Sequence, residues 1–171
     1  LACYYIIMPA EVSSNLSRYD GVKYGHYADA AKTLNDRYLQ SRDQGFNAEA
    51  KRRILIGTYM LSSGYYDAYY KQAQKVRNKL IDEFNRAFEQ FDVLVGPVAP
   101  SLPFSLGEKQ DDPLSMYLGD IMTVAPSLAG LPVVSMPAGW SHALPVGIQI
   151  IGAQTHEATV LNVAQQLEAA S

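Results

Sequence analysis

A single long segment, residues 65–91, constrains the fold of this chain more than any other. Apolar side chains recur along it at steps of three and four residues, with polar and charged side chains between them. The apolar positions are Tyr69, Ala73, Val76, Leu80, Phe84, Ala87 and Phe91. This spacing aligns the apolar side chains on one face of a helix. The segment therefore predicts a long amphipathic helix that packs on a core.

Short apolar segments predict the strands of a sheet. Residues 92–97, 133–137 and 145–152 combine apolar and β-branched side chains with Gly or Pro at their ends. The apolar, β-prone run at residues 1–8 predicts a further buried strand. Strands that alternate with helices indicate an α/β fold. Such apolar strands suit a sheet covered by helices on both faces.

Shorter helices complete the expected pattern. Pro9 fits the first turn of a helix that runs to about Ser17, and Asn47 is a suitable N-cap for another. The remaining helices are expected at residues 29–44, at 114–128 with a bend near Pro126, and at 157–168.

The first residues also bear on the extent of the chain. It opens without an initiator Met, directly in the apolar run, and its strands are few relative to its helices. A domain rarely begins abruptly inside a core strand. We therefore expect a part of a longer polypeptide, with processing or omission of terminal residues as the alternative.

Charge and cysteine content narrow the function classes. The net charge is −3 and the pI is near 5.6, which argues against a general nucleic-acid-binding surface. The one cysteine, Cys3, excludes an internal disulfide, so a reducing cytoplasm is the expected compartment. In an apolar run, Cys3 is expected to be a buried, inert thiol. No apolar run approaches the length of a membrane span.

The sequence contains no complete catalytic signature. GxSxG, HExxH, P-loop and GxGxxG motifs are absent, and the three histidines lack metal-ligand spacing. The serine pairs Ser13–Ser14 and Ser62–Ser63 are expected to be structural, because neither pair lies in a glycine-rich loop.

Two charged positions nevertheless stand out. Arg53 belongs to a basic run, residues 51–53, near the start of a helix. The run is either a solvated basic face or, because the helix dipole disfavours cations there, a place that binds an anion or a partner. Gly57 falls on the same helical face and would leave room for a group to approach Arg53. Asp120 interrupts apolar sequence, so its carboxylate must be hydrogen-bonded, paired or directed at a pocket. On a strand, one of Tyr4 and Tyr5 would also face a cavity.

At these residues the sequence resembles the A subunits of the bacterial aspartyl/glutamyl-tRNA amidotransferases, which are amidase-signature enzymes. The similarity extends over essentially all 171 residues. The matching stretches include EVSSNLSRYDGVKYG at 11–25, KRRILIGTY at 51–59, SSGYYDAYY at 62–70, DPLSMY at 112–117, LAGLP at 128–132 and PVGIQIIG at 145–152. The last two are shared by amidase-signature enzymes broadly, and the others are specific to these subunits.

The resemblance implies a glutaminase. Such subunits hydrolyse glutamine and pass the ammonia to a partner subunit, which amidates Glu-tRNA(Gln) or Asp-tRNA(Asn). Their Ser–cis-Ser–Lys triad lies in a Gly- and Ser-rich half that precedes the region seen here, and no segment of this chain matches it. The resemblance therefore implies that residues 1–171 are the C-terminal part of a single amidase-signature domain with an incomplete mixed sheet. Without the nucleophile no acyl-enzyme forms, so the chain alone is expected to be inactive.

The resemblance also implies part of a glutamine site. A Tyr, an Arg and an Asp bind the substrate in this family, and by motif position they correspond to Tyr4, Arg53 and Asp120. Tyr5 and Arg52 are the alternatives if the register slips by one residue. Glutamine is a zwitterion, and Arg offers bidentate geometry to its carboxylate.

The same resemblance implies the partners of this chain. It is expected in a cytoplasmic heterotrimer with B and C subunits, and in indirect contact with tRNA through B. The partner subunit is expected to use ATP and Mg²⁺, and this chain is expected to bind no cofactor or metal.

Three other interpretations stay open from the sequence. The chain could be an autonomous module that docks partner subunits, which should fold as a monodisperse, cooperatively melting monomer. It could bind RNA through the basic side chains of the helix predicted at residues 65–91, although the interleaved Asp82 and Glu83 weaken this interpretation. It could also belong to an amidase-signature enzyme with a different amide substrate.

Overall fold

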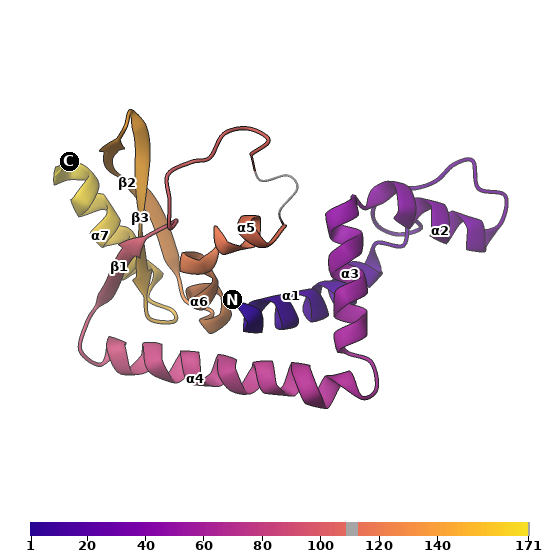
Figure 1. The fold of residues 1–171 in the computed structure, drawn as a ribbon, viewed down its shortest axis with the longest axis horizontal. Coiled ribbons are helices and arrows are strands. Elements are labelled where there is room, and N and C mark those ends of the chain that lie inside the picture. Colours follow the sequence, from indigo (N-terminus) through magenta and orange to yellow (C-terminus); the bar gives the residue numbers. More distant parts are fainter. Residues whose placement is uncertain (109–112, 171) are drawn as a thin grey trace. The chain divides into compact units, whose positions relative to one another are not determined.

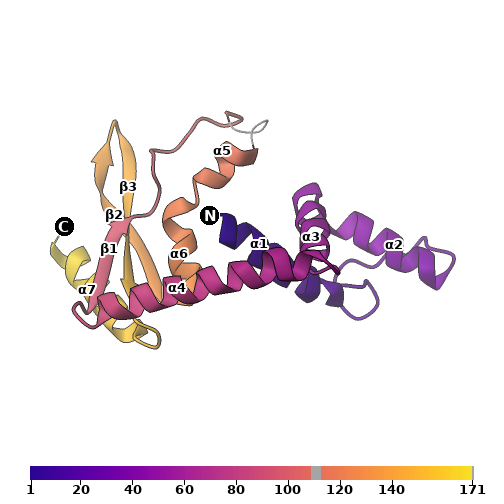
Figure 2. The same cartoon turned by 60° about the horizontal axis from the view of Figure 1, so that its bottom comes forward.

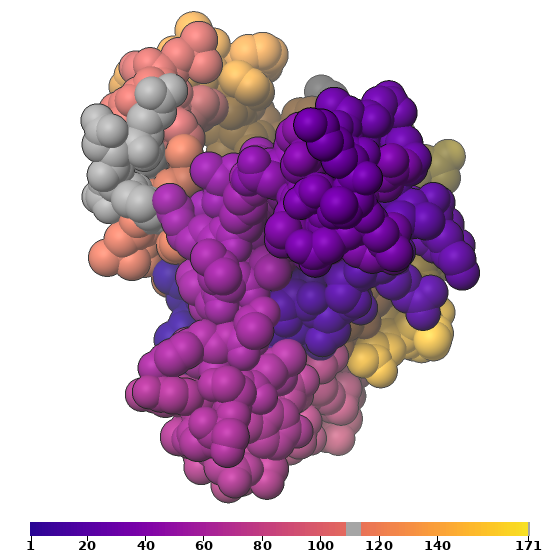
Figure 3. All heavy atoms as spheres, turned by 90° about the vertical axis from the view of Figure 1, so that its right-hand side faces the viewer, coloured from indigo at the N-terminus to yellow at the C-terminus, as the bar shows by residue number. Residues whose placement is uncertain are grey.

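The computed structural model describes residues 1–108 and 113–170. Two units divide the chain: an N-terminal unit of residues 2–75, and a C-terminal unit of Leu1 with the residues from Val76 onward. Figure 3 looks onto the N-terminal unit, whose purple atoms face the viewer. Among the described residues, no helix is long and apolar enough to cross a membrane.

The N-terminal unit is helical (Figure 1). Its elements in chain order are α1 (Ala2–Asn15), a 3-10 turn (Leu16–Arg18), α2 (Leu34–Gly45), α3 (Ala48–Met60), a π-helical turn (Tyr66–Tyr70) and the first residues of α4 (Lys71–Phe88). Residues 65–91 thus form a long helix as predicted, except that a π turn opens it and it ends at Phe88.

The expected strand at residues 1–8 is wrong, because this run is the first half of α1 and Pro9 lies inside that helix. A continuous apolar run carries no period, so it does not distinguish a buried strand from a buried helix. In the structure, Ile7, Pro9 and Ala10 are buried. Cys3 is only half-buried, and its thiol donates to the carbonyl of Ala73 at 3.1 Å, so the expectation of a buried Cys3 is also wrong.

α1 packs directly against α3, and Gly57 permits the contact. A Cβ at this position would overlap the carbonyl carbon and oxygen of Pro9. Gly57 therefore makes room for the backbone of α1, and not for a group that approaches Arg53 as the sequence suggested.

α2 begins later than expected because Thr33 caps it. The Thr33 hydroxyl oxygen accepts the Asp36 N–H at 3.1 Å, and the hydroxyl donates to the Asp36 carboxylate at 2.8 Å. The first bond satisfies a backbone N–H that a helix start leaves unpaired, and the second joins the two side chains. The expected stop at Gly45 is confirmed.

The C-terminal unit is built on a three-stranded sheet. Its strands are β1 (Val93–Pro97), β2 (Val133–Ser141) and β3 (Leu144–Gly152), in the order β1-β3-β2 with both pairs antiparallel. The helices are α5 (Pro113–Leu118), α6 (Ile121–Ala129) and α7 (Glu157–Ala170), together with most of α4. The α/β class and all three strands are confirmed. Within the described residues the sheet is antiparallel, where a mixed sheet was expected.

Alternate residues of β3 face different helices. Figures 1 and 2 show α7 and α6 on opposite sides of the sheet. Ile150 is fully buried, and a Cβ at Gly152 would overlap Val160 of α7. On the other face, the side chain of Gln149 reaches α6. The sheet therefore forms the centre of this unit and fixes the position of α6.

The single helix expected at 114–128 is instead two helices. The break falls at Gly119 and Asp120, whereas Pro126 lies inside α6 without ending it. Gly is a poor helix former, and the new helix begins with N–H groups that bond to the backbone carbonyl of Asp120.

The contact between α1 and α3 predicts a strong effect of one added methyl group. Gly57→Ala should lower the free energy of unfolding by about 1–3 kcal/mol, because the new Cβ meets backbone that cannot move aside freely. Urea unfolding measures the change. Gly96→Ala is the control, since no atom lies within 4 Å of a Cβ there. Equal effects of the two substitutions would contradict this packing.

Candidate functional site

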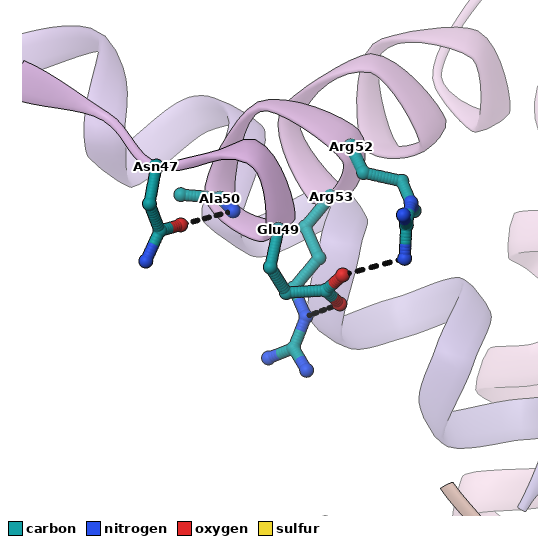
Figure 4. A network of polar contacts seen from close by, with 5 residues as sticks. All are labelled: Asn47, Glu49, Ala50, Arg52 and Arg53. Atoms are coloured by element: carbon teal, nitrogen blue, oxygen red, sulfur yellow. Dashed lines mark hydrogen bonds and ion pairs between the residues drawn. The ribbon is translucent and has the colours of Figure 1, made fainter. Parts of the chain in front are cut away.

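The first predicted site residue, Arg53, belongs to a small network at the start of α3 (Figure 4). The Asn47 side chain accepts the Ala50 N–H at 2.8 Å, which confirms Asn47 as the N-cap. In the same turn, the Glu49 carboxylate accepts from Arg53 Nε at 2.9 Å and from Arg52 Nη1 at 2.8 Å. The anion expected for this basic turn is therefore supplied within the helix itself.

Glu49 leaves the two arginines in different states. Arg53 is engaged through Nε, and its two terminal nitrogens point away from Glu49 in Figure 4. Arg52 uses a terminal nitrogen, and its side chain is 50% exposed against 34% for Arg53. A carboxylate ligand is best bound by parallel N–H groups of one guanidinium. This geometry favours Arg53 over Arg52 for such a role.

Tyr4, the second predicted residue, is half-buried on α1. Its ring meets that of Tyr5 edge to face, with centroids 5.2 Å apart and planes at 89°. Because both lie on a helix, the expectation that they point to opposite faces of a strand is wrong. Tyr4 and Arg53 both belong to the N-terminal unit, on the two helices that pack together.

Asp120, the third predicted residue, lines a pocket of about 700 Å³ in the C-terminal unit. The other walls are the loop 98–104, Met116, Gly119, Ser135 and residues 145–147. Asp120 is exposed, and its backbone carbonyl accepts the N–H groups of Thr123 and Val124 at 3.0 and 3.1 Å. A carboxylate at a helix N-terminus is favoured by the helix dipole. Lining a pocket is one of the three situations that the sequence analysis allowed for Asp120.

Two polar residues near these positions escaped the sequence analysis. Glu49 was signalled by its spacing of three and four residues from Arg52 and Arg53, the distance at which helical side chains meet. Gln149 was signalled as the one polar residue in the apolar run of β3. Gln149 is 3% exposed and bonds to backbone carbonyls next to the Asp120 pocket.

A cluster of tyrosines follows α3. The ring of Tyr65 lies 4.1 Å from that of Tyr59 and 6.0 Å from that of Tyr69, measured between centroids. The hydrogen bond with Tyr65, together with desolvation, raises the pKa of Tyr59 to about 12. Tyr59 therefore stays protonated at neutral pH and acts here as a packing and hydrogen-bonding group.

The serine pairs make local bonds. Ser13 donates to the Ala10 carbonyl at 2.8 Å and Ser62 to the Tyr59 carbonyl at 2.6 Å, which confirms a structural role for these hydroxyls. His26 pairs with Gln44. In the part of the chain that the structure describes, no group of three His, Cys, Asp or Glu side chains could hold a metal ion.

Residues 1–161 match the family model described as Amidase. The chain belongs to the amidase family. The A subunit of the glutamyl-tRNA(Gln) amidotransferase from Thioalkalivibrio sulfidiphilus is 57% identical over 96% of this amidase chain, which spans 34% of that protein. The equivalent protein of Thermotoga maritima, known from a crystal structure, is 35% identical with a TM-score of 0.54 and matches over 93% of this chain and 36% of its own. A crystal structure of an amidase gives 26% identity and a TM-score of 0.62, over 80% of this chain and 31% of its own.

The N-cap of α3 predicts a measurable stability effect in this amidase chain. Asn47→Ala should lower the free energy of unfolding by about 1 kcal/mol, because the Ala50 N–H loses its acceptor. Asn47→Asp keeps an acceptor and should retain most of the stability. Urea unfolding compares the three proteins, and an Asp variant as unstable as the Ala variant would contradict the capping role.

Proposed function

We propose that this chain acts as the C-terminal part of the glutaminase component of a tRNA-dependent amidotransferase. The observation that carries the proposal is the identity of 53–57% to the A subunits of glutamyl-tRNA(Gln) amidotransferases, over nearly all of this chain. The chain spans about a third of the length of these relatives. The rest of the protein then supplies the Ser–cis-Ser–Lys triad, and the present residues supply part of the substrate site.

Tyr4, Arg53 and Asp120 are the proposed glutamine ligands. The terminal nitrogens of Arg53 suit the α-carboxylate, because Glu49 holds the guanidinium through Nε and leaves the fork directed outward. The exposed carboxylate of Asp120 suits the α-ammonium, and it lines a pocket of about 700 Å³, a size ordinary for a small-molecule site. Tyr4 contributes a hydroxyl from the helix that packs against the one that bears Arg53.

The proposed reaction divides between the subunits. A serine of the preceding part attacks the side-chain amide of glutamine and releases ammonia, and water then hydrolyses the acyl-enzyme to glutamate. The ammonia reaches the B subunit, which uses ATP and Mg²⁺ to amidate the aminoacyl-tRNA. The relatives are named as one subunit of a glutamyl-tRNA(Gln) amidotransferase, which supports work in an assembly, and we propose B and C partners in the cytoplasm.

Substitution of Arg53 tests the substrate assignment. In the full-length protein within its complex, Arg53→Ala should raise the KM for glutamine by about 10- to 100-fold, because hydrogen bonds to charged groups contribute about 1.5–3 kcal/mol. Steady-state glutaminase assays measure KM and kcat.

Arg52→Ala is the matched control, since it also removes a partner of Glu49 from the same turn. The KM of Arg52→Ala should stay within about twofold of the wild-type value. A loss of about 1.4 kcal/mol of binding would instead raise KM about tenfold. An unchanged KM in Arg53→Ala rejects the assignment of Arg53, and a selective effect of Arg52→Ala transfers the role to Arg52.

The division of labour makes a second prediction. Residues 1–171 alone should release no ammonia from glutamine above background, because no acyl-enzyme forms without the nucleophile. Ammonia release is measured beside that of the full-length protein, with both at equal concentration. Turnover by the isolated chain would refute the division and point to a nucleophile within it.

A different amide substrate is the second candidate. It is favoured by the match to the amidase family as a whole and by the TM-score of 0.62 to an amidase. Hydrolysis of simple aliphatic or aryl amides by the full-length protein, with no turnover of glutamine, would select it.

A further inference from the structure

Gln149 is a polar residue in a place where an apolar one would be expected. It lies in the middle of β3, between Ile148 and Ile150, and only 3% of its surface is exposed. Its Oε1 atom is buried and accepts no hydrogen bond in the described part of the chain. A buried acceptor without a partner carries a desolvation cost. Stability of the sheet alone therefore gives no reason for an amide here.

The amide nitrogen of Gln149 supplies a hydrogen-bond donor that the backbone of α6 lacks. In an α-helix, each carbonyl accepts the N–H of the residue four positions later. The residue four positions after Met122 is Pro126, which has no N–H. Gln149 Nε2 donates to the Met122 carbonyl at 2.9 Å and thus takes the place of the missing donor. This bond satisfies the carbonyl that Pro126, inside α6, leaves without a backbone donor.

The same nitrogen holds the opposite wall of the Asp120 pocket. It donates to the carbonyl of Pro97 at 2.8 Å, at the end of β1. Val98, the next residue, begins the loop that lines the pocket, and Met122 lies two residues after Asp120. One NH₂ group therefore joins the first turn of α6, which carries Asp120, to the start of the facing loop.

From this geometry we propose that Gln149 is a positioning residue for the substrate pocket. It acts through the backbone of α6 and β1 and sets the distance from Asp120 to the 98–104 loop. The inference rests on the proposed function, in which Asp120 binds the ammonium of glutamine. A shift of α6 would then weaken substrate binding more than it slows the chemical step, because the nucleophile belongs to another part of the protein.

A double-mutant cycle in the full-length protein within its complex tests this role. Gln149→Met keeps the length of the side chain and removes both donors. We expect the KM for glutamine to rise on the order of tenfold, a 1.4 kcal/mol loss of binding, with kcat changed far less. Pro126→Ala restores an N–H for the Met122 carbonyl. It should by itself leave KM near the wild-type value, and in the double variant it should reverse a substantial part of the rise in KM.

Gln154→Met is the matched control. Gln154 Nε2 also donates to α6, at the Ala129 carbonyl and a distance of 2.9 Å, but Gln154 does not line the pocket. This variant should leave KM unchanged. If Gln149→Met does not assemble into the complex, the double variant provides the measurement, because its Met122 carbonyl regains a donor. A KM of the double variant above that of Pro126→Ala supports the positioning role, and an equal KM refutes it.

The other outcomes are equally decisive. An unchanged KM in Gln149→Met, an equal rise in Gln154→Met, or no recovery in the double variant overturns the positioning role. A wild-type complex that hydrolyses no glutamine refutes the proposed function instead. The melting temperatures of the wild type, Gln149→Met, Pro126→Ala and the double variant then decide whether Gln149 replaces the missing N–H. If the changes in melting temperature of the two single variants simply add in the double variant, Gln149 does not serve as that replacement.

Discussion

The C-terminal unit depends on how the free backbone carbonyls of α6 are satisfied. Helix α6 is short, apolar and interrupted by Pro126, so hydrogen bonds within the helix leave several of its carbonyls without donors. Side chains from elsewhere supply them: Gln149 to Met122, Arg77 to Leu128 at 2.7 Å, and Gln154 to Ala129. Left-handed Gly130 adds a backbone cap, with Leu131 N–H bonded to the Pro126 carbonyl. The helix is thereby bonded to α4, to β3 and to the segment after β3, and the bond from Gln149 is the one that lies beside the Asp120 pocket.

The parts of the fold that could be predicted from sequence are those whose signal is local. The strands at residues 92–97, 133–137 and 145–152, the cap at Asn47 and the terminal helix all carry their pattern within a few residues. The parts that failed depend on partners distant in sequence. Pro126 was expected to bend a helix, and the donor that replaces its missing N–H is the amide of Gln149, in a strand that comes later. Gly57 likewise has its meaning from Pro9 on another helix.

In the candidate site too, the residues that could be predicted are those with a local signal in the sequence. Arg53 and Asp120 were identified because charge in the first turn of a helix, or within apolar sequence, is visible locally. The clamp that Glu49 forms on Arg52 and Arg53 requires the helix to be known first. Tyr4 was assigned through the family resemblance. The argument that one of two consecutive tyrosines on a strand faces a cavity was wrong, because α1 is a helix.

Two of the proposed glutamine ligands lie at helix starts, and their electrostatic situations are opposite. The dipole of α3 disfavours a cation in its first turns, and Glu49 offsets this by placing a carboxylate on Arg53 without using the terminal nitrogens. The dipole of α6 favours Asp120, so the charge itself is stabilised there, but the position of that helix start must be held. Helix ends fray where their backbone groups lack partners. Asn47 accepts an N–H in the first turn of α3, and Gln149 of β3 donates to the Met122 carbonyl of α6, which Pro126 leaves without a backbone donor. In both helices, the proposed charged ligand residue is thus accompanied by a second polar residue that bonds to the backbone of the same helix start.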